Sequence, residues 1–86
     1  MNISKKHLKT LHAIFEKPAR SDIKWVDIEN LFYHLNAEIT EGNGSRVRIY
    51  LHDVRAVFHR PHPRRETDKG TVASVKKFLE NAGVLL

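Results

Sequence analysis

Apolar residues recur at helical spacing in the first part of the chain. Leu8, Leu11 and Ile14 fall on one side of a helix with 3.6 residues per turn. Ser4 is a suitable N-cap, and Pro18 disfavours helix in the residue before it. The pattern therefore predicts a first helix over residues 4–16, followed by a short polar link.

A second apolar stripe with the same period follows this link. Its members are Trp25, Ile28, Leu31, Phe32 and Leu35. Ser21 or Asp22 is expected to cap the helix that this stripe predicts. A third helical pattern begins near Thr71 and ends before Gly83, which is a natural C-cap. It is expected to bury Val72, Val75, Phe78, Leu79 and Ala82.

Between these helices the period changes from 3.6 to 2, which is typical of strands. A short strand is predicted over residues 37–41, and it ends at the glycine-containing turn of residues 42–44. Two further strands are predicted over residues 46–51 and 54–59, joined by a tight turn at His52-Asp53. Pro61 and Pro63 prevent the last strand from continuing as a paired ladder.

The order of elements predicts an α+β fold. Residues 21–86 form an α-β-β-β-α unit with a three-stranded antiparallel sheet, and residues 1–20 add an N-terminal helix and link. If the helices cover one face of the sheet, that face holds Val47, Ile49, Leu51, Val54, Ala56 and Phe58. The open face then displays Arg46, Arg48, Tyr50, Arg55 and His59. Such a surface suits phosphate and offers one ring for stacking on a base.

The distribution of charge supports a basic binding surface. The net charge is +5, but residues 46–69 alone hold seven Lys or Arg against three acids, whereas residues 21–45 hold one against five. Six of the seven arginines lie between Arg46 and Arg65. Guanidinium groups bind phosphate oxygens in pairs and release counterions, so this cluster indicates nucleic acid. The alternative is an ordinary solvated face of a basic protein.

Other classes of site and location are disfavoured. The chain has no cysteine, which excludes disulfides, thiolate metal sites and a cysteine nucleophile. His59 and His62 have no third ligand at a convincing spacing, so no metal and no cofactor is expected. No segment approaches the ~20 apolar residues of a membrane span, and no secretory signal is visible. A cytoplasmic location is therefore the expectation, and the oligomeric state stays open.

The second half of the chain resembles the HicA family of toxins. The run from Pro61 to Gly83 carries a Pro-His-Pro, then Lys-Gly-Thr, then a helix ending in Ala-Gly. Gly44-Ser45 resembles the Gly-Ser that precedes the catalytic histidine of the family, and the resemblance covers residues 22–84. It implies a fold like that of double-stranded-RNA-binding domains (dsRBDs), ribosome-independent mRNA endoribonuclease activity and a partner antitoxin.

The chain departs from the family at the catalytic position, where Arg46 replaces the usual histidine. Metal-free cleavage of RNA needs a base for the 2′-hydroxyl proton, and histidine titrates near neutrality. Arginine stays protonated, so Arg46 can stabilise charge on phosphorus but cannot be the base. His59 is the candidate replacement, since it is predicted on the open face among arginines. A contact to phosphate or antitoxin, or a simple surface role, is the alternative for His59.

Further RNA contacts are expected in the loop before the last helix and at the start of that helix. The residues expected to bind RNA there are Arg60, His62, Arg64, Arg65 and Lys69. For His62, between two prolines, a purely structural role in the turn is the alternative. The helix start itself, at Gly70 and Thr71, could bind a phosphate through its free N–H groups or could simply be capped. Three hypotheses result: an mRNA interferase with altered catalytic residues, a non-catalytic RNA-binding module, and a protein that mainly engages an antitoxin.

Overall fold

The computed structural model describes residues 3–86 and confirms the predicted α+β fold. The elements in chain order are α1 (Lys5–Phe15), α2 (Trp25–His34), β1 (Glu38–Glu41), β2 (Arg46–Leu51), β3 (Val54–His59) and α3 (Lys69–Asn81). The three strands form one antiparallel sheet in the order β1-β2-β3.

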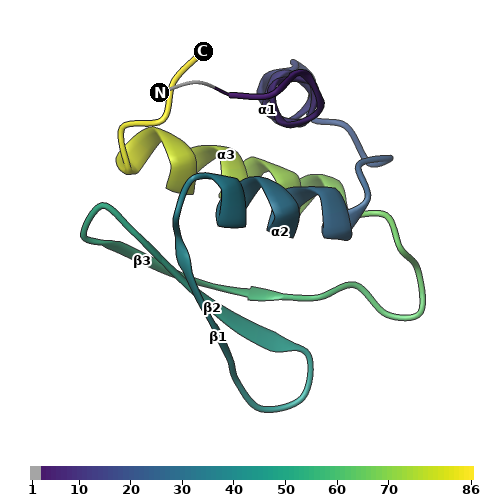
Figure 1. The fold of residues 1–86 in the computed structure, drawn as a ribbon. Coiled ribbons are helices and arrows are strands. Elements are labelled where there is room, and N and C mark those ends of the chain that lie inside the picture. The colour runs from purple at the N-terminus through teal and green to yellow at the C-terminus, as the bar shows by residue number, and fades with distance from the viewer. Residues whose placement is uncertain (1–2) are drawn as a thin grey trace.

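The elements are stacked in three layers. Helices α2 and α3 both lie over one face of the sheet, and α1 lies on the far side of these two helices (Figure 1). The sheet therefore has one covered face and one open face. Leu11 and Ile14 of α1 are buried, so this helix contributes to the same core as α2 and α3.

The core is built where the sheet meets α2 and α3. The covered face of β2 and β3 buries Val47, Ile49, Leu51 and Phe58, as strand alternation predicts. The ring of Phe32 in α2 lies 6.1 Å from that of Phe58 and 5.7 Å from that of Phe78 in α3. These aromatic contacts join helices and sheet at the centre of the molecule, because large rings bury the most area in a small core.

The turns between strands are as predicted. His52 and Asp53 both adopt positive φ, at 48° and 64°, which is the conformation that a two-residue hairpin turn requires. Gly44 also has a positive φ of 62°, in the turn between β1 and β2. The ends of α3 are close to those predicted, since Gly83 adopts a φ of 82° just after Ala82, the C-cap.

The predicted N-cap of the second helix is wrong. Neither Ser21 nor Asp22 caps α2: the N-cap is Lys24, which makes no side-chain hydrogen bond. The backbone supplies the partner instead, because the N–H of Trp25 donates to the carbonyl of Arg65 at 3.0 Å. Residues 23–25 pair with residues 65–67, so a segment distant in sequence satisfies the start of this helix.

Candidate RNA-binding face

The open face of the sheet carries the basic residues that strand alternation places there. Arg46, Arg48, Arg55 and His59 are exposed on it, and Tyr50 is partly buried between its neighbours. The strand register sets Tyr50 opposite Arg55 and Arg46 opposite His59. Directly opposed side chains in an antiparallel pair have Cβ atoms about 4.5–5.5 Å apart, so these pairs are neighbours on one surface.

Three residues that sequence reasoning did not assign to the site share this face. Glu38 lies opposite Tyr50, and Thr40 lies opposite Arg48, in the pairing of β1 with β2. Val57 on β3 lies opposite Arg48 on the other side and is 52% exposed. The register of β1 against β2 would have revealed Glu38 and Thr40, but register depends on long-range pairing and cannot be derived from alternation within one strand.

Tyr50 is held in position by two contacts. Its hydroxyl donates to Asp53 Oδ1 at 2.7 Å, across the turn between β2 and β3. This hydrogen bond raises the pKa of Tyr50 above its ordinary value, because it stabilises the neutral phenol. The guanidinium of Arg55 lies over the ring, 5.2 Å from its centre. The ring is thereby fixed on the open face.

His59, at the end of β3, is oriented by Ser45. The distance from Ser45 Oγ to His59 Nδ1 is 3.4 Å, and the backbone N–H of Arg60 donates to the carbonyl of Ser45 at 2.9 Å. If Nδ1–H donates to Ser45 Oγ, Nε2 is unprotonated and can accept a proton. Arg46 is the cross-strand partner of His59 on the same face. A potential base and a fixed positive charge thus stand side by side.

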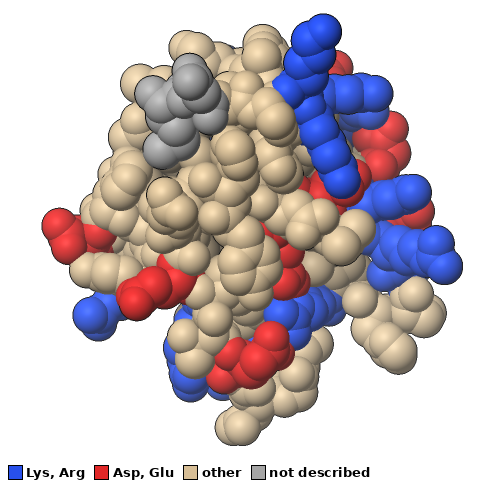
Figure 2. All heavy atoms as spheres, viewed as in Figure 1, with Lys and Arg blue, Asp and Glu red and all other residues tan. Residues whose placement is uncertain are grey.

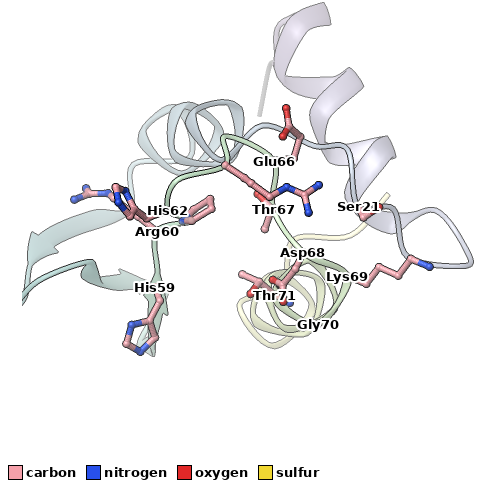
Figure 3. A pocket seen from close by; sticks show the side chains of 12 residues that line it. Ser21, His59, Arg60, His62, Glu66, Thr67, Asp68, Lys69, Gly70 and Thr71 are labelled. Carbon is pink, nitrogen blue, oxygen red and sulfur yellow. Dashed lines mark hydrogen bonds between the residues drawn. The ribbon is translucent and has the colours of Figure 1, made fainter.

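A groove of about 690 Å³ separates the end of the sheet from the start of α3. Five of the residues that line it were assigned to the site by the sequence analysis, namely His59, Arg60, His62, Arg64 and Lys69. His59 and His62 lie on one side of it, and Asp68 and Thr71 lie on the other (Figure 3). The groove therefore continues the open face past His59.

Arg60 does not lie free on this surface. Its guanidinium binds two carboxylates, with Nε 2.6 Å from Glu29 Oε2 and Nη1 2.5 Å from Glu41 Oε1. The hydrogen bonds that Arg60 donates to Glu41 hold the pKa of this carboxyl group below its usual value. The sequence analysis assigned Arg60 to RNA because it lies in the arginine cluster. In the structure its guanidinium, directly after β3, is paired with Glu29 on α2 and Glu41 on β1. Arg65 is exposed but lies outside the groove beside His59.

The start of α3 is occupied by a side chain of the chain itself. Asp68 is the N-cap, and its Oδ1 accepts from the backbone N–H of Thr71 at 3.2 Å. The carboxylate takes the place that a phosphate would need and adds a negative charge beside it. Of the two alternatives for Gly70 and Thr71, the geometry favours plain capping.

On the side of the molecule seen in Figure 2, basic and acidic side chains are interleaved rather than separated into two halves. Lys and Arg gather over the α1–α2 and β3–α3 connections at the right of the view and again beside the sheet at the bottom, with acidic side chains between them (Figure 2).

Within residues 3–86, no three His, Asp or Glu side chains come together in a way that could hold a metal ion. No helix in that part of the chain is long and apolar enough to cross a membrane.

A three-stranded antiparallel sheet with helices on one face, in this order of elements, places the protein in the dsRBD-like class of α+β proteins. Residues 25–84 match the family model described as the HicA toxin of bacterial toxin-antitoxin systems. The chain belongs to this family, which implies a partner antitoxin, and α1 lies outside the matched residues. Searches of curated proteins and of solved structures found no significant match.

Proposed function

We propose that the protein is a toxin that binds RNA on the open face of its sheet and cleaves it without a metal. The observation that carries this proposal is the cross-strand pair of Arg46 and His59 among further arginines on one exposed surface. The arginines attract the phosphate backbone, and their planar groups and Tyr50 suit unpaired RNA. Family membership supports the same reading, because the chain has a toxin's fold with a basic face.

The chemistry assigned to His59 is general base catalysis. Nε2 takes the proton of a ribose 2′-hydroxyl, the 2′-oxygen forms a bond to phosphorus, and the bond from phosphorus to the 5′-oxygen breaks. The leaving 5′-oxygen takes a proton from water. Arg46 stabilises the extra negative charge on the phosphoryl oxygens in the transition state. The products are a 2′,3′-cyclic phosphate and a 5′-hydroxyl.

The catalytic step is tested with purified protein and RNA in EDTA. His59→Ala should lower the cleavage rate by about 10²–10⁴-fold, the usual contribution of a positioned base. The matched control is His12→Ala, since His12 is an exposed histidine on α1, away from the sheet. Undiminished cleavage by His59→Ala would show that another residue is the base.

RNA binding is tested separately through its salt dependence. Arg46→Ala and Arg64→Ala should each weaken binding and reduce the slope of log affinity against log salt by about one. Lys77→Ala is the control, because it removes one positive charge from an exposed position on α3. Binding that does not depend on salt would refute the arginine face.

A second function, a non-catalytic RNA-binding module, is favoured by the resemblance described above, which sets Arg46 at the position of the family's catalytic histidine. Salt-dependent RNA binding by the wild type without cleavage would establish it. Expression in cells distinguishes the toxin, since growth arrest should be relieved by co-expression of the neighbouring open reading frame as antitoxin.

A further inference from the structure

The open face contains a shallow depression of about 450 Å³ at the end away from His59. Two rows of cross-strand neighbours form it, and they run across all three strands. The rows consist of Glu38, Tyr50 and Arg55, and of Thr40, Arg48 and Val57. Because strands rise about 3.4 Å per residue, the first row lies about 14 Å and the second row about 7 Å from the row of Arg46 and His59. A ligand in this depression would therefore be distinct from a phosphate beside His59.

The floor of the depression is a platform for a flat ring. Tyr50 is oriented by its hydrogen bond to Asp53, and the guanidinium of Arg55 lies against its ring. Nucleobases stack both on aromatic rings and on guanidinium planes, so either exposed surface of this pair can hold one. Val57, at 52% exposed, adds an apolar wall beside the platform.

Glu38 is the residue in the depression that phosphate binding does not explain. A carboxylate on a basic face repels phosphate, and so lowers the affinity that the surrounding arginines provide. Among the described residues, arginine ion pairs engage Glu16, Asp22, Glu29 and Glu41, and Glu38 takes part in none of them. Glu38 is exposed, is the cross-strand partner of Tyr50 and lines the depression. It is therefore available to accept hydrogen bonds from a ligand.

We propose that this depression binds one unpaired guanine of the RNA, an inference that rests on the proposed function. Guanine has two adjacent N–H donors on its Watson–Crick edge, N1–H and N2–H, which match the two oxygens of the Glu38 carboxylate. On its other edge, O6 and N7 accept from the guanidinium of Arg48, which is the commonest specific contact to this base. Adenine, cytosine and uracil each lack the paired donors. Glu38 and Arg48 are thus specificity-determining residues.

The proposal is tested by measuring the affinity of the whole protein for short uridine oligonucleotides that contain one central G, A, C or U. The oligonucleotides carry 2′-fluoro groups, so they cannot be cleaved through the 2′-oxygen. At about 0.15 M salt, fluorescence anisotropy should show that the oligonucleotide with G binds about tenfold more tightly than the others, within the discrimination of ~1–3 kcal/mol expected of a bidentate pair. Glu38→Gln should reduce this preference to about twofold or less.

Glu38→Gln should not weaken binding of the all-uridine oligonucleotide, because the substitution removes a repulsive charge. The control Glu80→Gln removes the same charge from an exposed position on α3 and should keep the preference for G. Equal affinity of the wild type for all four oligonucleotides, or a preference that survives Glu38→Gln, overturns the guanine site and leaves RNA binding standing. If the wild type binds none of them, the proposed function itself fails.

Discussion

The mostly buried carboxylate of Glu29 joins two distant parts of the chain, and its removal should lower the stability of the fold. Glu29 lies on α2 and accepts from Arg60 Nε at 2.6 Å and from Arg60 Nη2 at 3.1 Å. It also accepts from the indole N–H of Trp25, one turn earlier on the same helix. The side chain of Glu29 is 13% exposed and that of Arg60 is 31% exposed, so solvent replaces these partners only in part.

The expected magnitude follows from these contacts. Glu29→Ala leaves the guanidinium with Glu41 alone and leaves the buried Trp25 without its acceptor. A hydrogen bond to a charged group contributes ~1.5–3 kcal/mol, and partial exposure together with the surviving Glu41 partner reduces the sum. We expect the free energy of unfolding to fall by about 2–3 kcal/mol, which is a loss of about 10–20 °C in Tm for a domain of this size.

Thermal unfolding followed by Trp25 fluorescence and circular dichroism measures this change. The matched control is Asp22→Ala, because Arg20 also binds two carboxylates, Glu16 and Asp22. In that cluster all three side chains are at least 40% exposed, so Tm should hardly change. Equal and small losses in Glu29→Ala and Asp22→Ala would refute the argument that burial makes the Arg60 cluster structural.

A double variant separates the ion pair from other effects of the substitution. Glu29→Ala combined with Arg60→Ala should be less destabilised than the sum of the two single variants, because each single variant already breaks the same contact. Additive losses would contradict a direct interaction. In RNA binding, Arg60→Ala should change the salt dependence less than Arg46→Ala, since the charge of Arg60 is already paired with Glu29 and Glu41.

Two further predictions concern stability. The ring of His7 in α1 stacks on that of His34 in α2 with centroids 4.4 Å apart, and burial, followed by repulsion from His34, lowers the pKa of His7 below its ordinary value of 6.5. The unfolded chain then binds the proton more readily than the folded chain. The free energy of unfolding therefore has its full value above pH 6.5, decreases as the pH falls from 6.5 to the lowered pKa of the folded state, and is constant below that pKa. Tm measured at about pH 7.5 and about pH 5 should show this fall, and His7→Gln should reduce it; an identical difference in that variant would rule out His7 as the titrating group. Gly83→Ala should lower the free energy of unfolding by about 1 kcal/mol in urea unfolding, because an L side chain is strained at a φ of 82°, and an unchanged midpoint would contradict this.

The sequence alone predicted the elements and the face on which the site lies. Periods of 3.6 and 2 are properties of local backbone geometry, so the apolar stripes gave the helices and the alternation gave the strands. The same alternation separated Val47 and Ile49 on the covered face from Arg46 and Arg48 on the open face. Glycine and the His52-Asp53 pair marked turns, because those positions require positive φ.

The tertiary structure decided which charges remain available for a ligand. The six arginines between Arg46 and Arg65 cannot be distinguished from the sequence pattern. Folding brings Arg60 into contact with Glu29 and Glu41, which lie 31 and 19 residues away in the chain. The pairing register of β1 brings Glu38 beside Tyr50 on the open face, where no spacing within a single strand could have placed it. Pairing partners across a fold depend on register and loop closure, which are long-range properties of the whole chain. The sequence therefore determined the basic face of this toxin family member, and only the folded chain determined which of its side chains are free to bind.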